Sequence, residues 1–298
     1  MRTMTFRATA AAAAVVLAGS LAACGGDDGD DSSAPEPNED ATFEAGTTMA
    51  KIQEAGTLRV GTKFDQPGFG LQGLEDDPEG FDVEIAKIIA AELGLDPESA
   101  IEYTQAPSEV REQVIEDGDV DMVVATYTIN DERKQRISFA GPYYTAGQML
   151  MVAEDNDTIT APEDLADNPD QQVCSVNGST PSENIREYLA SEDQLTLFDE
   201  YSQCVDALGN GQVDVVTTDN VILLGYVGDS DGAYKLVGEQ FTEEPYGIGI
   251  KKGDTEFCEF INTALQDNED AYLEAWENTA GKVEGTETPE LPEPDACA

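Results

Sequence analysis

The chain of 298 residues carries 62 Asp and Glu against 15 Lys and Arg, a formal net charge of −47 at pH 7. A surface this acidic repels nucleic acids and anionic lipids, so we expect neither as a partner. Histidine is absent, which removes the commonest general base and metal ligand and argues against a hydrolase. No CxxC pair, calcium-loop spacing or GxxxxGK[ST] motif occurs, so we predict no metal, nucleotide or other cofactor.

The N-terminus has the pattern of an exported lipoprotein. Two arginines precede an alanine-rich apolar run at residues 8–17, and Leu-Ala-Ala then leads to Cys24. The run is too short to span a bilayer, which takes about 20 apolar residues, so residues 1–23 are interpreted as a signal peptide. The Leu-Ala-Ala-Cys sequence resembles the bacterial lipoprotein cleavage box, which implies that Cys24 is the lipid anchor. We predict a disordered acidic tether at residues 24–50, because residues 25–48 contain no basic residue and few apolar ones.

Four further cysteines remain, an even number in an exported chain, so disulfides are expected. Cys174 lies on an apolar strand-like stretch and Cys204 on a predicted helix, and we pair these two. Cys258 and Cys297 are then left as the second pair, which would attach the proline-rich tail to the last helix. Unpaired thiols are the alternative.

Strand and helix signals alternate after the tether. Residues 57–62 and 101–105 have the pattern of strands, whereas residues 81–93 and 108–116 have the pattern of helices, the first of which Gly94 would end. This alternation predicts a parallel α/β sheet.

One segment occurs twice. Residues 116–126, EDGDVDMVVAT, match residues 209–219, GNGQVDVVTTD. Each copy has the pattern of a helix end, a tight turn and a buried strand, which indicates two similarly wound lobes. Ligands bind beyond the carboxyl ends of parallel strands in open α/β sheets. Thr126 and Asp219, which end the two copies, are therefore expected to face one cleft from opposite lobes.

Arg133 closely follows the first copy. Thr128 offers a hydroxyl where the strand ends, and Asn130 can cap a helix that has Arg133 in its first turn. A guanidinium can bind a carboxylate through two parallel hydrogen bonds, which a lysine cannot do. The alternative is a surface ion pair with Asp131 or Glu132.

A glycine turn follows the strand of Cys174. Thr180 and Glu183 have the spacing of a capping box, and Pro181 suits the first helical position. The amides at such a helix start attract anions, and Gly178 would let the backbone approach a ligand closely. An ordinary helix cap without a ligand is the alternative.

Together these groups would form a receptor for an amino-acid headgroup. Arg133 and the amides near Thr180 could hold an α-carboxylate, while Thr126, Thr128 and Asp219 could accept hydrogen bonds from an α-ammonium group. A buried carboxylate needs a positive partner, which the ammonium would supply to Asp219. Alternatively, Asp219 caps the helix that follows it.

The chain resembles the polar amino-acid binding proteins of ATP-driven importers, solute-binding protein family 3, and within them the glutamate-binding lipoproteins of actinobacteria. The likeness spans about residues 57–281, and it is carried by LRVGTKFDQPG, residues 80–82 and 119–144, CSVNGSTP, YSQCVDAL, residues 213–219 and YGIGIKK.

The resemblance implies a type II periplasmic-binding-protein-like α/β fold, with two doubly wound lobes joined by two hinge strands. Lobe 1 would comprise residues 51–151 plus 244–298, and lobe 2 residues 152–243. The hinge strands would lie near residues 149–153 and 245–250.

The resemblance also implies roles for site residues. By motif, Arg133 matches the carboxylate arginine, Thr126 and Thr128 the hydroxyl positions of the first lobe, Thr180 the amide contact of the second lobe and Asp219 the ammonium partner.

The sequence departs from many relatives where an aromatic ring covers the ligand, because residues 63–67 here read KFDQP. Phe64 is the candidate for that ring. Lys63 could meet a side-chain carboxylate at the edge of the cleft, and a surface lysine is the alternative.

The resemblance implies a receptor without enzymatic activity, lipid-anchored on the outer face of the cytoplasmic membrane. It would close on glutamate, or on aspartate, and deliver it to the membrane permease of an ABC importer. One alternative ligand is glutamine or a basic amino acid. An alternative of another class is an envelope enzyme on the same fold, a dehydratase or a peptidoglycan-cleaving enzyme.

Overall fold

A computed structural model of the protein describes residues 35–74 and 77–298. The predicted signal peptide, Cys24 and the first part of the predicted tether lie outside these residues. Within the described part, no helix is both long and apolar enough to cross a bilayer. The same part contains no group of three or more His, Cys, Asp or Glu side chains placed to hold a metal ion.

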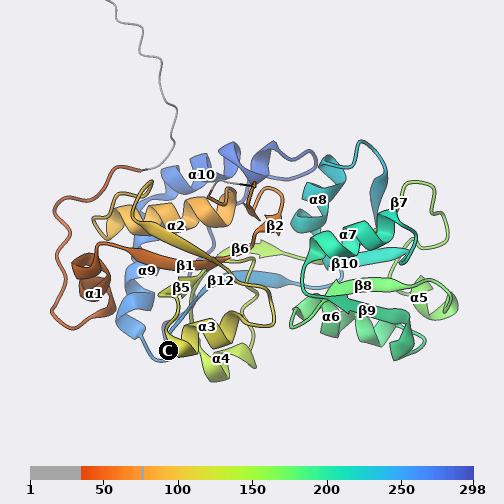
Figure 1. The fold of residues 1–298 in the computed structure, drawn as a ribbon, viewed down its shortest axis with the longest axis horizontal. Coiled ribbons are helices and arrows are strands. Elements are labelled where there is room, and N and C mark those ends of the chain that lie inside the picture. The colour runs from red at the N-terminus through yellow and green to blue at the C-terminus, as the bar shows by residue number, and fades with distance from the viewer. Residues whose placement is uncertain (1–34, 75–76) are drawn as a thin grey trace, which may run out of the picture. The chain divides into compact units, whose positions relative to one another are not determined.

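The first of two five-stranded sheets has the order β4-β1-β5-β12-β6 and takes strands from distant parts of the chain (Figure 1). Its strands are β1 Leu58–Thr62, β4 Ile101–Gln105, β5 Met122–Val123, β6 Ser138–Ala146 and β12 Glu244–Ile250. A two-stranded hairpin, β2 Asp65–Gln66 and β3 Gly70–Leu71, follows β1. We call the elements built on this sheet the first lobe.

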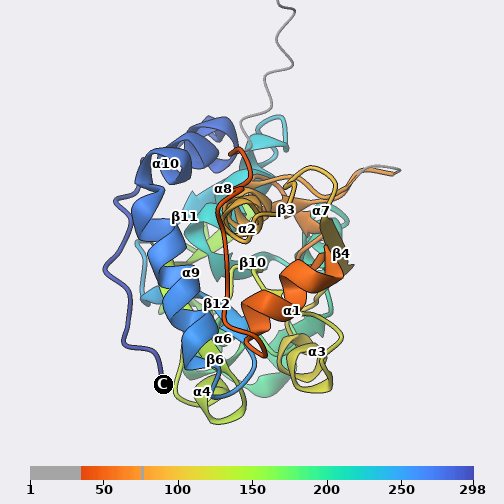
Figure 2. The ribbon, with the colours of Figure 1, turned by 90° about the vertical axis from the view of Figure 1, so that its left-hand side faces the viewer.

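Helices cover both faces of the first sheet (Figure 2). Apolar side chains of α2, α9 and α10 pack in one core cluster, and Ile115 of α3 lies in a second cluster with Tyr127. The helices of this lobe are α1 Thr48–Ala55, α2 Phe81–Glu92, α3 Arg111–Asp117, α4 Arg133–Arg136, α9 Thr255–Asp267, α10 Glu269–Asn278 and the 3₁₀ turn η3 Ala280–Lys282.

The second sheet has the order β11-β7-β10-β8-β9, and we call the elements built on it the second lobe. Its strands are β7 Gln148–Ala153, β8 Val173–Val176, β9 Leu195–Phe198, β10 Val215–Asp219 and β11 Tyr234–Val237. Its helical segments are α5 Asp164–Asp167, α6 Thr180–Asn184, η1 Ile185–Tyr188, η2 Glu192–Gln194, α7 Tyr201–Gly209 and α8 Asn220–Gly228.

Both sheets are mixed, whereas the sequence pattern predicts parallel ones. β1, β4 and β5 run parallel, but β12 runs antiparallel to β5 and β6. Likewise β8, β9 and β10 run parallel, and β7 runs antiparallel to β10 and β11. The reason is that β7 and β12 come directly from the other lobe. The parallel strands of each sheet end at the edge that faces the other lobe. A strand that begins at that edge therefore runs antiparallel to them.

The chain crosses between the sheets twice. It passes from β6 to β7 at Gly147 and from β11 to β12 over residues 238–243. The first crossing lies before the boundary expected at residue 151. The segments expected as hinge strands correspond to β7 in the second sheet and β12 in the first.

The sequence repeat has a matching structure in each lobe. Gly118 and Gly211 both adopt a positive φ, 73° and 66°, at the turn before the strand. The carboxylate of Asp121 then accepts a hydrogen bond from the backbone N–H of Arg59 at 2.9 Å, and that of Asp214 accepts one from Gln172 at 2.8 Å. Each copy thus fastens its strand to the neighbouring parallel strand in the same way.

The second part of the predicted tether is folded, so the expectation of disorder over residues 24–50 is wrong there. The backbone N–H of Asn38 donates to the carbonyl of Ala91 at 2.8 Å, and Phe43 packs edge-on against Phe260 with ring centres 5.4 Å apart. These partners on α2 and α9 lie far along the chain, which is why local composition does not reveal them.

The part of the chain that the structure describes contains two disulfides, and they join the expected pairs. Cys174 of β8 is bonded to Cys204 of α7, and Cys258 of α9 is bonded to Cys297. The second bond holds the C-terminal tail on the first lobe, where the backbone N–H of Asp295 also donates to the carbonyl of Gly141 at 2.7 Å.

Candidate functional site

Tyr246 of β12 contacts both Asp219, which ends the second repeat copy, and Thr128, two residues beyond the first copy. Its hydroxyl donates a 2.6 Å hydrogen bond to Oδ2 of Asp219, the last residue of β10. Its backbone forms a β-bridge with Thr128. Thr128, which follows β5, and Asp219, at the end of β10, therefore lie on either side of Tyr246.

Arg133 is buried and lies between the lobes. Its backbone N–H donates to Oδ1 of Asn130 at 2.8 Å. The predicted N-cap is nevertheless wrong, because α4 begins at Arg133 and Glu132, not Asn130, occupies its N-cap position. Nη1 donates to the carbonyl of Thr128 at 2.7 Å, and Nη2 donates to the carbonyl of Gly178 at 2.9 Å. Nε lies 3.4 Å from Oε1 of Glu112. A guanidinium has five N–H groups, so one on Nη1 and one on Nη2 remain for a carboxylate.

This geometry contradicts the alternative of a surface ion pair with Asp131 or Glu132. Only 6% of Arg133 is exposed, and its acidic partner is the buried Glu112 of α3. Desolvated charges require paired hydrogen-bonding partners, so the surroundings of Arg133 suit a binding role better than a solvated one.

Thr126 adopts an uncommon backbone conformation. Its φ is 45°, in the left-handed region that non-glycine residues rarely occupy. The backbone N–H donates to Oδ2 of Asp82 at 2.8 Å, and the hydroxyl lies 3.0 Å from Oε1 of Gln66. Tyr143 donates to the other oxygen of Asp82 at 2.6 Å. Burial raises the pKa of Asp82 to about 7 despite these two hydrogen bonds.

The predicted capping box at Thr180 is wrong. Ser179 is the N-cap of α6, and its hydroxyl accepts a 3.1 Å hydrogen bond from the backbone N–H of Ser182. Thr180 is the first residue of the helix, so its hydroxyl is free for other contacts. It donates to Oε2 of Glu244 at 2.7 Å and lies 3.2 Å from the hydroxyl of Thr128 in the first lobe.

Asp219 occupies the N-cap position of α8 but makes no capping hydrogen bond with its side chain. The alternative role as a helix cap is therefore wrong. Oδ2 accepts from Tyr246, whereas Oδ1 is buried and has no partner among the described residues. Burial, followed by the nearby charge of Glu244, raises the pKa of Asp219 to about 7. A ligand cation would satisfy Oδ1 and lower that pKa again.

Lys63 is buried, which contradicts the alternative of a surface lysine. It is 3% exposed, and Nζ donates to the hydroxyl of Ser108 at 2.9 Å. Burial, and next the positive charge of Arg111, lower the pKa of Lys63 to about 7. Its location is thus electrostatically unfavourable for a cation unless an anion joins it.

Arg111 is a site residue that the sequence analysis misses. It is 2% exposed, Nη1 donates to the carbonyl of Ala125 at 3.0 Å, and the guanidinium lies 4.0 Å from the ring centre of Tyr127. Nε is buried without a partner in the described part of the chain. Burial, and then the charge of Arg133, lower its pKa to about 10. The one signal in the sequence that could have indicated Arg111 is its place on the buried side of a predicted helix in a chain with few basic residues.

The sequence analysis also assigns no role in the site to Asp82, Ser108 or Glu244. Each contacts a predicted site residue through one hydrogen bond or more: Asp82 with Thr126, Ser108 with Lys63 and Glu244 with Thr180. These contacts join elements far apart in the sequence, so no local motif indicates them.

Phe64 lies at the edge between the lobes. It is half-buried and lines a surface hollow together with Gln105, Glu200 and Tyr226. A ring there can cover the cleft from outside.

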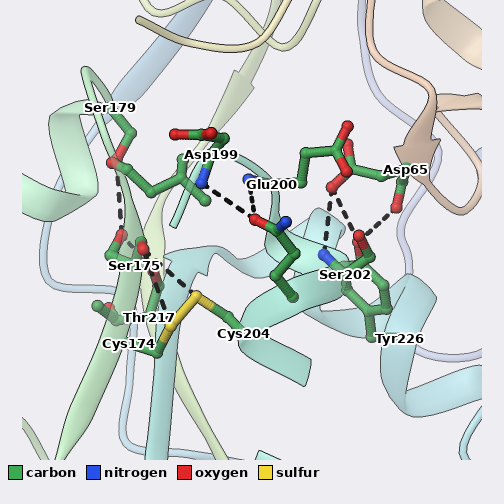
Figure 3. The surroundings of a disulfide bond; sticks show 12 residues. Asp65, Cys174, Ser175, Ser179, Asp199, Glu200, Ser202, Cys204, Thr217 and Tyr226 are labelled. Carbon is green, nitrogen blue, oxygen red and sulfur yellow. Dashed lines mark hydrogen bonds between the residues drawn. A yellow bond between two sulfur atoms is a disulfide. The ribbon is translucent and has the colours of Figure 1, made fainter. Parts of the chain in front are cut away.

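Contacts between the lobes continue beside the Cys174–Cys204 disulfide (Figure 3). Asp65 of β2 accepts a hydrogen bond from the backbone N–H of Ser202 at 3.2 Å, and its carbonyl accepts from the hydroxyl of Tyr226. The hairpin of the first lobe is thereby fastened to α7 and α8 of the second.

Two glycines let the lobes approach this closely. A Cβ on Gly178 would lie 2.7 Å from Cα of Glu109, and one on Gly225 would lie 2.6 Å from the carbonyl oxygen of Pro67. Both separations are too short for a real side chain, so glycine is required at these positions for the lobes to meet.

Comparison with known proteins agrees with this architecture. The family model of bacterial extracellular solute-binding proteins, family 3, matches residues 58–275. The glutamate-binding protein GluB of Corynebacterium efficiens is 42% identical over 75% of this chain and 78% of its own length. The ABC transporter glutamine-binding protein GlnH of Bacillus subtilis is 39% identical over 74% of this chain and 78% of its own.

Solved structures share the fold. An ancestral arginine-binding protein bound to glutamine has a TM-score of 0.69 and 36% identity, over 76% of this chain and 99% of that one. The ancestral amino-acid-binding protein AncCDT-1, a precursor of cyclohexadienyl dehydratase, has a TM-score of 0.70 and 31% identity, over 78% and 99% of the two chains. The two-lobed α/β architecture is the type II periplasmic-binding-protein fold. The chain belongs to the bacterial extracellular solute-binding proteins of family 3.

Proposed function

We propose that this protein is the extracytoplasmic receptor of an amino-acid ABC importer and that its ligand is glutamate. One observation carries the choice of ligand: Lys63 and Arg111 are buried close enough for Arg111 to lower the pKa of Lys63, and neither has an ion-pair partner among the described residues. Lys63 donates to the neutral hydroxyl of Ser108 and Nε of Arg111 has no acceptor there, whereas Arg133 is paired with Glu112. Buried like charges are costly unless anions balance them. A ligand with two carboxylates supplies more of that balance than a ligand with one.

Each end of the ligand has its own set of residues in this proposal. The α-carboxylate binds the two remaining N–H groups of Arg133, with Thr128 and Thr180 beside it. The α-ammonium binds Oδ1 of Asp219, which has no partner within residues 35–74 and 77–298. Lys63 and Arg111 receive the side-chain carboxylate.

Closure is the signal that the receptor gives to the importer. Ligand contacts from both lobes favour the closed form, and a ligand shifts the population only by its differential affinity for that form. The similarity to an ABC transporter glutamine-binding protein supports docking on a membrane permease. We further propose that residues 1–23 direct export and that Cys24 carries a lipid anchor to the outer face of the cytoplasmic membrane, on the grounds of their sequence pattern.

Glutamine is the second candidate, since similarity to glutamine-binding relatives favours it. The buried cations Lys63 and Arg111 argue against it, because an amide side chain neutralises neither of them. Aspartate would carry the same charges as glutamate on a side chain one methylene shorter. An enzyme is the candidate of another class, since one structural neighbour is a precursor of a dehydratase. Relatives named as binding proteins, and the lack of histidine in the chain, favour a receptor without catalysis.

Titration calorimetry with glutamate, aspartate, glutamine, arginine and lysine tests the proposal. We expect glutamate to bind most tightly and glutamine at least about tenfold more weakly, since a lost buried charge contact costs about 1.4 kcal/mol or more. Tight arginine binding without a glutamate signal would contradict the choice of ligand. Mass spectrometry after incubation tests the enzyme alternative, and any conversion of a bound amino acid would contradict a pure receptor.

A further inference from the structure

Gln66 is a buried side chain with one end unsatisfied. It is the second residue of β2 and is fully buried. Its Oε1 accepts from the hydroxyl of Thr126 at 3.0 Å, whereas Nε2 has no acceptor among the described residues. A buried amide N–H without an acceptor destabilises a fold. A glutamine at this position is therefore not explained by its contribution to stability.

A second buried glutamine shows how this chain satisfies such a side chain where it serves the fold. Nε2 of Gln194 lies within 3.3 Å of three backbone carbonyls, those of Leu165, Asn168 and Gln171. Its Oε1 accepts from the backbone N–H of Ala190 at 3.0 Å. Gln194 therefore has partners at both ends, whereas Gln66 has a partner at one.

Gln66 lies between the chain segments that carry Lys63 and Arg111. Gln66 pairs with Gly70 in the β2–β3 hairpin, and a Cβ on Gly70 would lie 2.5 Å from the carbonyl oxygen of Lys63. The hairpin thus packs directly on the backbone of Lys63. On its other side, Gln66 touches Thr126, whose neighbour Ala125 accepts from Arg111.

We propose that Gln66 is a specificity-determining residue, which donates a hydrogen bond from Nε2 to the side-chain carboxylate of the bound glutamate. The inference rests on the proposed function, since it needs glutamate as the ligand. Lys63 and Arg111 supply charge to that carboxylate, and Gln66 supplies a neutral donor at a fixed position. Thr126 holds the carboxamide in orientation through Oε1.

The first test exchanges Gln66 for an apolar side chain of similar volume. Gln66→Met removes the donor, and we expect the Kd for glutamate to rise about 10- to 100-fold, the usual effect of losing a hydrogen bond to a charged group. The melting temperature without ligand should not fall, because the unsatisfied donor is gone and the Thr126 hydroxyl can still donate to the carbonyl of Ala125, 2.8 Å away. Gln194→Met is the matched control and should do the reverse, with a lower melting temperature and an unchanged Kd.

The second test separates direct contact from action through Thr126. Gln66→Glu places a carboxylate against that of glutamate, while the amide of glutamine can still donate to it. The ratio of the two Kd values should shift towards glutamine by about 100-fold relative to the unmodified protein. Equal losses for both ligands, or a Gln66→Met variant within twofold of the unmodified protein, would overturn the role of Gln66. If the unmodified protein did not bind glutamate, both proposals would be overturned.

Discussion

Nη2 of Arg133 donates a 2.9 Å hydrogen bond to the carbonyl oxygen of Gly178. Arg133 belongs to the first lobe and Gly178 follows β8 of the second, so this bond exists only while the lobes are in contact. The side chain proposed to hold the α-carboxylate is thus itself a link between the lobes. Ligand binding and closure therefore depend on one guanidinium, and losing it should affect both.

The first prediction concerns that guanidinium. Arg133→Lys keeps the charge but cannot reproduce the planar set of hydrogen bonds, so the Kd for glutamate should rise at least about 100-fold, or roughly 3 kcal/mol. Titration calorimetry measures the change. Arg136→Lys is the control, because Arg136 lies in the same short helix and pairs with Glu116 at the surface. Similar affinities for the two variants would contradict the role of Arg133.

The second prediction concerns closure. Replacing Gly225 by alanine should stabilise α8 by about 1 kcal/mol, because alanine has the higher helix propensity. The added Cβ, however, would lie 2.6 Å from the carbonyl oxygen of Pro67. We expect Gly225→Ala to keep or raise the melting temperature and to weaken glutamate binding at least about tenfold, because the closed form is blocked. Gly228→Ala is the control, since its nearest neighbour is 3.8 Å away, at Val283. Small-angle scattering with saturating glutamate should show a more open Gly225→Ala protein than the control.

The third prediction concerns the side chain of the ligand. Lys63→Met removes one buried cation, so it should weaken glutamate far more than glutamine, by a difference of about 10-fold or more. Lys251→Met at the exposed Lys251 is the control and should change neither affinity. Equal losses for the two ligands would mean that Lys63 does not contact the side-chain carboxylate.

The fourth prediction is that glutamate affinity is greatest near neutral pH. The pKa of Asp219 is raised to about 7, so acid protonates the group that would bind the ammonium. The pKa of Lys63 is lowered to about 7, so alkali neutralises the group that would bind the carboxylate. Both declines should start near pH 7, the pKa of each group in the free protein, and each should level off at the shifted pKa of the bound form. Calorimetry from pH 5 to 8.5, where the ammonium of free glutamate stays protonated, should show both declines, and Lys63→Met should lack the alkaline one. A flat profile would contradict both roles.

The fifth prediction concerns stability without ligand. The pKa of Asp82 is raised from 3.8 to about 7, so the folded protein binds more protons than the unfolded chain between these values. The free energy of unfolding should therefore fall as pH rises from about 4 to about 7 and then lose no more from this group. Asp82→Asn keeps an acceptor for the Thr126 N–H and removes the titration. Urea unfolding at several pH values should give a shallower decline in the variant, and identical slopes would contradict the pKa shift.

Local features of the site could be predicted from the sequence because their partners are near in the chain. The hydrogen bond from the Arg133 N–H to Asn130 joins residues three apart, and the repeat places Thr126 and Asp219 at equivalent strand ends. The predicted capping box places the N-cap of α6 at Thr180, one residue too late. Ser179 has an equally suitable hydroxyl and takes the extended conformation of an N-cap.

Features that depend on distant partners could not be predicted. Arg111 has no motif, and its burial follows from the packing of α3 against Tyr127 and the segment after β5. Mixed sheets arise because the chain crosses between lobes, and the folded acidic segment depends on contacts with α2 and α9. In each case tertiary contacts decide a structure that local composition leaves open.

A crystal structure of the protein with glutamate bound tests the central claim most directly, because it shows which end of the ligand meets which buried cation. The account predicts the α-carboxylate on Arg133, the ammonium on Oδ1 of Asp219 and the side-chain carboxylate within hydrogen-bonding distance of Lys63. A glutamate bound with its side chain away from Lys63 and Arg111, or bound outside the cleft between the lobes, would contradict it.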